Sequence, residues 1–171
     1  ILPFAVFMLT AVAVPAISTT PAMFYPIRVI LVAAAVALVW PVLRDIVWRV
    51  SPLSWLAGGL VGLMWVLMPV APSDGPLPYG TLSGGMVALW FVFRGIGTVL
   101  LVPMVEELFF RDYLERRLRG TDLDRPAPWP RVLLAAVITA GLFAALHDRW
   151  AEAFVAGLVF SAVAWRSGRI S

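Results

Sequence analysis

The stretch MVALWFVFRGIGTVLLVPMVEELFF, residues Met86–Phe110, decides the fold class of this chain. It is almost wholly apolar, and it is longer than the roughly 20 residues that a helix needs to cross a bilayer. It has no alternation of period two and is too long for a buried strand. We therefore predict a membrane-spanning helix that carries a pair of glutamates close to its end.

Five further stretches are similarly apolar and too long for buried strands. They are Ile1–Ser18, Pro26–Leu43, Pro52–Ala71, Pro130–Leu146 and Trp150–Trp165. Composition points the same way, because 61% of the 171 residues are hydrophobic and 13% are charged, whereas a soluble domain has roughly 25% charged residues. A soluble fold of this size could not bury so much apolar surface. We predict an all-α, multi-pass transmembrane helical bundle with about six spans.

The predicted spans fall into two parts. Residues 1–85 form N-terminal transmembrane helices, and residues 86–171 form a core that contains the polar cluster. The sequence starts at Ile1 rather than at Met, and it stops at Ser171 just after a hydrophobic span. We therefore expect it to be a piece of a longer protein that has further spans.

Arginine placement predicts the orientation of the spans. All thirteen basic residues are Arg, which fits a GC-rich bacterial genome and therefore a bacterial inner membrane. Basic loops lie in the cytoplasm; the loop Pro72–Gly85 has no basic residue, and the turn before the last span has only Arg149. Arg28 and Arg94 are different, because they lie inside the second and fourth spans. The loops after spans two, four and six carry these arginines: Arg44, Arg49, Arg111, Arg116, Arg117, Arg119, Arg125, Arg131, Arg166 and Arg169.

Cysteine labelling tests this orientation, because the chain has no native Cys. We expect a membrane-impermeant thiol reagent added from outside to label an Asp74→Cys variant and not an Asp122→Cys variant. The opposite labelling pattern would overturn the assignment.

Glu106 and Glu107 lie near the end of the fourth predicted span, where carboxylates are rare and usually functional. Glu107 precedes Arg111 by four residues, which is the favourable order for an ion pair on a helix. The positions three and four residues from Glu106 are apolar. Such surroundings disfavour an ionised carboxylate and prepare it to act as a base near neutral pH. Pro103, one turn earlier, removes a backbone hydrogen bond and can kink the helix.

The fourth helix should continue past Phe110 to about Leu118. Asp112–Leu118 keeps helical spacing, and no breaker occurs before Gly120. The charged end of this helix also has a plainer interpretation, as a cluster that ends a span at the membrane surface. We expect that role for Arg116, Arg117 and Arg119.

Phe143 and His147 are four residues apart, so they share a face of the fifth predicted helix. A single histidine at the end of a span often does no more than hydrogen-bond to a loop. In combination with Glu106, however, it completes the pair of groups that can activate water without a nucleophilic Ser or Cys. The chain has no Cys and one His, which excludes thiolate chemistry and any site that needs two histidines.

At these residues the sequence resembles a known family. Glu106-Glu107-x-x-x-Arg111, followed by Phe143-x-x-x-His147, is similar to the CPBP family. This family consists of intramembrane glutamic endopeptidases and includes the CAAX proteases and the bacteriocin-processing or immunity proteins. The resemblance runs from about Arg94 to the end of the chain.

The resemblance implies an intramembrane endopeptidase that cleaves a membrane-associated peptide, such as a prenylated C-terminus or a sorting signal. Glu106 would be the general base that activates water, and His147 would assist it. Glu107 and Arg111 would form a supporting ion pair, and Phe143 would pack the pocket. The resemblance implies no cofactor and no metal. The partners would be membrane lipid and a peptide or protein substrate.

The family has a further motif, a His and an Asn four residues apart on a later helix, which stabilises the oxyanion. The sequence stops where that helix should begin, so we expect the motif to follow Ser171 in the complete protein. Without it the activity should be weak, since loss of one oxyanion donor costs about 10²–10³ in rate.

Other functions stay open on the residues alone. A small transporter could use Glu106 and Glu107 to relay protons, although no inverted repeat of broken helices is evident. A non-catalytic membrane scaffold or immunity protein could carry the same cluster. A metalloenzyme is disfavoured because the spacing is not His-Glu-x-x-His. Nucleic-acid binding is disfavoured because the net charge of +3 comes from loop arginines, which topology and anionic lipids explain better.

Overall fold

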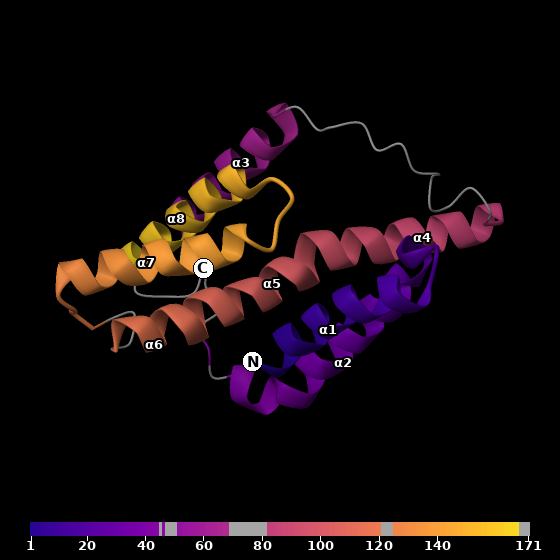
Figure 1. The fold of residues 1–171 in the computed structure, drawn as a ribbon, viewed down its shortest axis with the longest axis horizontal. Coiled ribbons are helices and arrows are strands. Elements are labelled where there is room, and N and C mark those ends of the chain that lie inside the picture. Colours follow the sequence, from indigo (N-terminus) through magenta and orange to yellow (C-terminus); the bar gives the residue numbers. More distant parts are fainter. Residues whose placement is uncertain (45, 47–50, 69–81, 121–124, 168–171) are drawn as a thin grey trace. The chain divides into compact units, whose positions relative to one another are not determined.

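The computed structural model describes residues 1–44, 46, 51–68, 82–120 and 125–167. These described residues are helical nearly throughout and contain no strand, which confirms the predicted all-α fold (Figure 1). A 3-10 turn is labelled η1, and two π-helical segments are labelled η2 and η3. The elements are α1 (Leu2–Ile17), η1 (Pro21–Phe24), α2 (Tyr25–Leu43), α3 (Pro52–Leu67), α4 (Gly84–Ile96), η2 (Gly97–Leu101), α5 (Val102–Glu107), η3 (Leu108–Glu115), α6 (Arg116–Arg119), α7 (Trp129–Ala144) and α8 (Trp150–Ser167).

The segments from α4 to α6 form one uninterrupted helix, Gly84–Arg119. Its 36 residues correspond to about 54 Å at the rise of an α-helix, which exceeds the hydrocarbon thickness of about 30 Å. Gly120 ends the helix with a φ of 70°, a left-handed conformation that favours glycine. The predicted extension of the fourth helix to about Leu118 is therefore confirmed.

The chain forms two compact units. The first contains α1, η1 and α2 together with the long helix as far as Glu106. In this unit α1 and α2 form a helical hairpin, and α2 packs along α4 and η2. The indole N–H of Trp90 donates to the carbonyl oxygen of Ala22 at 2.9 Å, and the hydroxyl groups of Tyr25 and Thr98 lie 3.1 Å apart. These hydrogen bonds tie the hairpin to the long helix.

Gly97 is required where α2 approaches the long helix. A Cβ at this position would lie 2.5 Å from the hydroxyl oxygen of Tyr25 and 2.7 Å from Cγ2 of Val29. Any larger side chain would therefore push the hairpin away from the helix.

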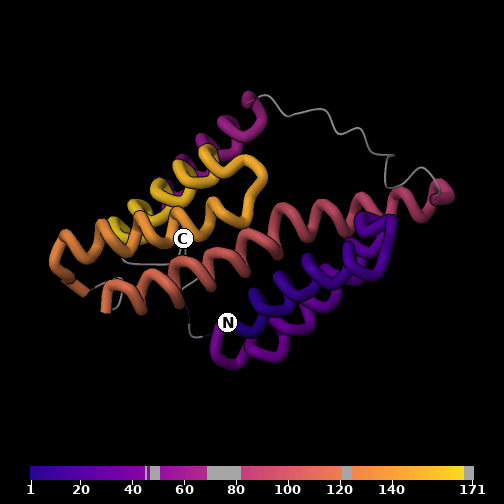
Figure 2. Tube along the Cα trace, in the orientation of Figure 1, coloured from indigo at the N-terminus to yellow at the C-terminus, as the bar shows by residue number. Residues whose placement is uncertain are grey.

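The second unit contains α3 and the chain from Glu107 onward. Here α7 and α8 pack along each other, α3 packs on α8, and η3 and α6 pack on α7 (Figure 2). The backbones of α7 and α8 come close together at Gly157, because a Cβ there would lie 2.9 Å from Cα of Ala140. Ala140 and Ala144 are buried on the same face of α7, where small side chains let helices approach closely.

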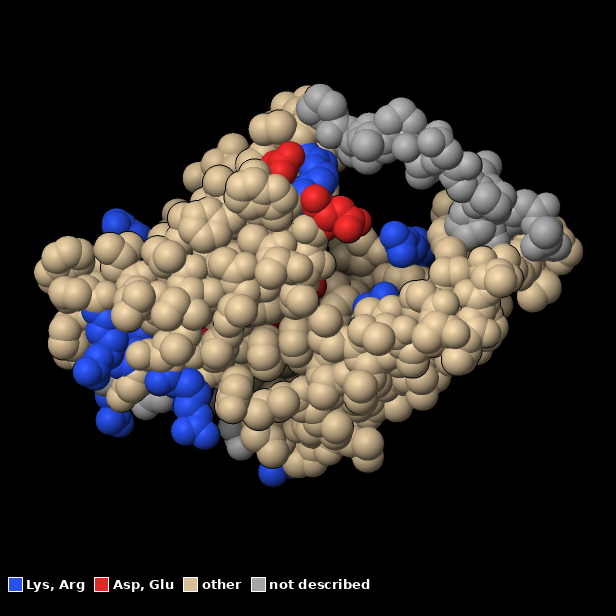
Figure 3. Space-filling model, viewed as in Figure 1, with Lys and Arg blue, Asp and Glu red and all other residues tan. Residues whose placement is uncertain are grey.

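Polarity is distributed as in a membrane protein rather than a soluble one. Three charged side chains, those of Arg111, Glu115 and Arg119, are 0% exposed, whereas large apolar side chains such as Leu38 and Val66 are 76% and 81% exposed. Soluble proteins bury few charges and expose few large apolar patches. Figure 3 shows a face with few charges, in which basic side chains gather around α6 and the start of α7.

Two helices are long and apolar enough to cross a membrane, namely Pro21–Leu43 and Gly84–Arg119. Shorter apolar helices are Leu2–Ile17, Pro52–Leu67 and Trp129–Ala144. Each of the six predicted spans contains a helix, and the number that cross the bilayer stays a prediction. The labelling positions Asp74 and Asp122, and the loop arginines Arg49 and Arg169, lie outside the described residues.

Candidate active site

Glu106 and Glu107 lie between the two π-helical segments of the long helix. At the end of η2 the backbone N–H of Val102 donates to the carbonyl oxygen of Gly97, five residues earlier. Pro103 follows directly; it has no N–H, and its ring crowds the carbonyl group four residues before it. The widened turn relieves that crowding, so the distortion expected from Pro103 takes the form of a π-helical turn. Such turns are frequent at functional sites.

A ladder of alternating charges begins at Glu107 and runs along one face of the helix. Its members are Glu107, Arg111, Glu115 and Arg119, each four residues from the next. Nε of Arg111 lies 3.9 Å from Oε2 of Glu107, which forms an ion pair with it, and Glu115 interacts electrostatically with Arg111 and Arg119. A π-helical turn holds more residues than an α-helical turn, so residues four apart stay close to one line.

The buried position of Arg119 contradicts one prediction from the sequence. We expected this side chain to be a charge at the membrane surface, and it is fully buried. Its Nη2 donates to the carbonyl oxygen of Arg125 at 3.5 Å. The physical reason is that Arg119 follows Glu115 by four residues, so it lies on the same buried face of the helix. Arg116 and Arg117 lie off that line; Arg116 pairs with Asp112 at 2.5 Å, and Arg117 is exposed.

Helix α8 provides the polar partners of this ladder. Nη2 of Arg111 donates to the carbonyl oxygen of Gly157 at 3.0 Å, and the hydroxyl of Ser161 donates to Oε2 of Glu115 at 2.9 Å. Gly157 and Ser161 are four residues apart on α8, just as Arg111 and Glu115 are on η3. The two segments therefore run in the same direction, and their matching four-residue spacing aligns both hydrogen bonds.

A row of aromatic rings connects the ladder to His147. The guanidinium carbon of Arg111 lies 5.9 Å from the ring centroid of Phe143. The rings of Phe110 and Phe143 meet edge to face at 5.3 Å, and those of Phe143 and His147 are 4.4 Å apart. Phe110 and Phe143 are both buried. The ring of His147 is thus held against a packed surface that includes the Arg111 side chain.

The backbone fixes which nitrogen of His147 carries the proton. Helix α7 ends at Ala144, and His147 lies in the turn that follows. Its Nδ1 lies 2.8 Å from the carbonyl oxygen of Phe143. A carbonyl oxygen can only accept, so Nδ1 must donate. In the neutral ring Nε2 is then the acceptor, which can bind a water hydrogen or take up a proton.

Trp65, on α3, packs against the turn that contains His147. Nη1 of Arg149 donates to the carbonyl oxygen of Trp65 at 2.8 Å, and its guanidinium group lies 5.0 Å from the centroid of the Trp65 ring. Nε and Nη2 of Arg149 also donate to Oε1 of Glu152, at 3.3 and 3.2 Å. The Trp65 ring meets the ring of His147 edge to face at 6.0 Å. Trp65 therefore contacts both residues of the turn.

Glu106 belongs to the first unit, where its environment differs from the apolar one suggested by its sequence neighbours. The guanidinium group of Arg28, on α2, interacts electrostatically with Glu106 and with Arg94. The sequence did not reveal this partner, because Arg28 and Glu106 are far apart in the chain.

Residues 88–171 match a family model described as type II CAAX prenyl endopeptidase Rce1-like. The matched part contains the glutamate pair, Arg111, Phe143 and His147. Residues 88–171 belong to the CAAX protease family. No curated protein and no solved structure gives a significant match to it.

Membership of the CAAX protease family confirms the resemblance seen in the sequence, and it makes this chain an integral membrane protein. The second unit of this CAAX protease family member brings four of the five predicted site residues together, as the connected series Glu107, Arg111, Phe143 and His147. Glu106 lies in the first unit, so its convergence with His147 stays a prediction. In the described part of the chain no cluster of three His, Asp or Glu side chains is arranged to hold a metal ion.

Several residues of this cluster were missed by sequence reasoning. Trp65, Arg149 and Ser161 stand outside the motifs, and nothing in their local sequence marks them. Glu115 had a signal in its four-residue spacing from Arg111. That spacing predicts an ion pair but not its burial.

Proposed function

We propose that this CAAX protease family member is a multi-pass intramembrane endopeptidase of a bacterial inner membrane. Its substrate is a membrane-associated peptide, such as a prenylated C-terminus or a sorting signal, and Glu106 activates the attacking water. The observation that carries the proposal is the family match over residues 88–171, which contains the paired glutamates and His147.

In the proposed reaction Glu106 takes one proton from a water molecule, and the resulting hydroxide attacks the carbonyl carbon of the scissile peptide bond. The tetrahedral intermediate collapses when the C–N bond breaks, and the proton passes to the departing amine. Nε2 of His147 accepts a hydrogen bond from the attacking water, since Nδ1 is committed to the Phe143 carbonyl. Glu107 and Arg111 position the helix and the ring of Phe143 and take no part in proton transfer.

The test uses the protein reconstituted in liposomes and a synthetic prenylated peptide that ends in a CAAX sequence. We expect release of a C-terminal fragment, detected by mass spectrometry, at a rate that a chelator such as 1,10-phenanthroline does not change. Inhibition by the chelator would indicate a metalloprotease instead. If the folded protein cleaved neither this peptide nor an unprenylated membrane-anchored peptide, the scaffold or transporter interpretation would replace the proposal.

We predict that the ring of Trp65 positions His147 for catalysis. Trp65→Leu removes the ring that contacts His147 and Arg149 but keeps the backbone carbonyl that accepts from Arg149. Loss of such an aromatic contact costs about 1 kcal/mol, so we expect kcat to fall roughly fivefold, with KM unchanged.

The matched control for this prediction is Trp55→Leu, on the same helix. Trp55 is 73% exposed, and we expect its replacement to leave kcat unchanged. Equal effects of the two substitutions on kcat would show that Trp65 does not position His147.

A further inference from the structure

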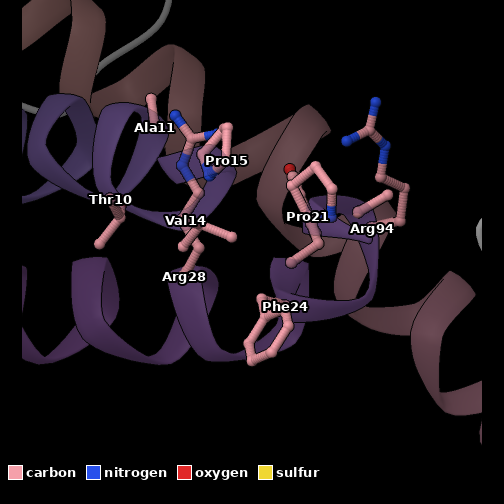
Figure 4. A pocket seen from close by; sticks show the side chains of 10 residues that line it. Thr10, Ala11, Val14, Pro15, Pro21, Phe24, Arg28 and Arg94 are labelled. Atoms are coloured by element: carbon pink, nitrogen blue, oxygen red, sulfur yellow. The ribbon is translucent and has the colours of Figure 1, made fainter. Parts of the chain in front are cut away.

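A cavity of about 180 Å³ lies in the first unit, between the α1–α2 hairpin and α4 (Figure 4). Its wall is mostly apolar and includes Val14, Pro15 and Phe24. Two arginines, Arg28 and Arg94, also line it. Figure 4 shows both guanidinium groups extending toward the same side of the view. Two cations on a mostly apolar wall are unusual, because charges within membrane segments are rare and mark binding or transport sites.

Arg94 is an exposed cation within an apolar helix. It lies ten residues after Gly84, and its guanidinium group is stacked 4.5 Å from the centroid of the Tyr25 ring. No carboxylate among the described residues is paired with Arg94. An exposed arginine at this depth must therefore face water or an anion that does not belong to the described part of the chain.

Arg28 connects the cavity to Glu106. Its Nη2 donates to the carbonyl oxygen of Phe7 at 3.2 Å, and the guanidinium group lies 4.1 Å from the centroid of the Phe7 ring. Its Nε is buried and has no hydrogen-bond partner among the described residues. The same guanidinium group interacts electrostatically with Arg94 and with Glu106. An anion in the cavity would offset the repulsion between the two cations.

We propose that this cavity binds the free C-terminal carboxylate of the peptide substrate, and that Arg28 and Arg94 hold it. The inference rests on the proposed function, because it places the scissile bond at Glu106. Guanidinium groups match a carboxylate with paired hydrogen bonds. The apolar wall accommodates the side chain of the last residue. A substrate bound in this way is cut at a fixed distance from its C-terminus.

The distances agree with a short C-terminal segment. Arg94 and Glu106 are twelve residues apart on one helix, which corresponds to about 18 Å along its axis, and long arginine side chains shorten that gap. An extended peptide covers about 3.5 Å per residue, so a segment of a few residues reaches from Glu106 to the cavity.

The experiment compares two peptides of one prenylated CAAX-type sequence, one ending in a free carboxylate and the other in a carboxamide. We expect the wild-type protein to cleave the carboxylate peptide with a kcat/KM at least tenfold higher. Arg94→Gln should lower that value far more than the carboxamide value, and so remove the preference for the free carboxylate. Arg117→Gln, an exposed arginine outside the cavity, is the matched control and should keep the wild-type preference.

Equal cleavage of both peptides by the wild-type protein would overturn the carboxylate site and leave the peptidase function intact. So would an Arg94→Gln variant that lost the same factor on both peptides.

A binding measurement separates the two proposals if nothing is cleaved. The short C-terminal peptide in its acid and amide forms is titrated against wild-type protein and Arg94→Gln. Tighter binding of the acid, lost in Arg94→Gln, supports the site even without hydrolysis. Equal binding of both forms overturns it. If instead Arg94→Gln weakened only the binding of phosphatidylglycerol vesicles, the occupant would be a lipid phosphate and the proposal would be wrong.

Discussion

Glu106→Gln is expected to lower kcat for peptide cleavage by about 10²–10⁴-fold, the usual contribution of a general base. The amide keeps the size and much of the hydrogen-bonding capacity of the carboxylate, but it cannot accept a proton from water at neutral pH. Substrate binding does not require the base, so KM should change little. The measurement is steady-state cleavage of the prenylated peptide by protein that elutes as a folded monodisperse species.

Two carboxylates on the same helix serve as comparisons for Glu106. Asp112→Asn makes the same chemical change at a residue that pairs with Arg116 on the surface, and it should leave kcat within about twofold, since exposed pairs contribute little. Glu107→Gln should act mainly through stability, because it leaves the buried Arg111 with one partner fewer. Wild-type activity in Glu106→Gln would end the glutamic-protease interpretation.

Arg111→Leu is expected to cause the largest loss of stability, about 3–5 kcal/mol, because it leaves Glu107 without its cation and Glu115 with one cation fewer. Arg111 is fully buried and interacts with both Glu107 and Glu115. It also donates to the carbonyl oxygen of Gly157, a residue at which α8 comes close to the backbone of α7. We expect the apparent Tm in detergent to fall by roughly 10 °C.

Arg117→Leu is the control for this loss. Arg117 is exposed on the same helix, and its guanidinium group lies 5.8 Å from the Tyr113 ring centroid. Its replacement should shift Tm far less. The double variant Arg111→Leu/Glu115→Gln should lose less than the sum of its single variants, because it removes opposite charges together. Equal Tm values for Arg111→Leu and Arg117→Leu would contradict the role assigned to the ladder.

The positions of the helices could be predicted from the sequence because apolar length is a local property. Met86–Phe110 is long enough for a span, and the spacing from Asp112 to Leu118 with Gly120 behind it gave the end of the long helix. The Glu107–Arg111 pair is also local, since four residues make one turn. The motif Glu106-Glu107-x-x-x-Arg111 with Phe143-x-x-x-His147 indicated the family, and the match over residues 88–171 then confirmed that resemblance.

The partners that come from distant segments could not be predicted in this way. Arg28 approaches Glu106 because α2 packs along the long helix, and Trp65 reaches His147 because α3 packs on α8. Helical periodicity shows which residues share a face, but it does not show what covers that face. The same limit explains Arg119, whose buried position depends on the segments that surround α6.

The central claim is that Glu106 and His147 form one site, and a cysteine crosslink tests it most directly. The chain has no native Cys, so the double variant Glu106→Cys/His147→Cys can be treated in membranes with a short bifunctional thiol reagent. Tyr25→Cys/Thr98→Cys is the positive control, since these two positions face each other where α2 packs on the long helix. We predict that both pairs crosslink at comparable rates. Crosslinking of the control pair alone would contradict a shared site for Glu106 and His147.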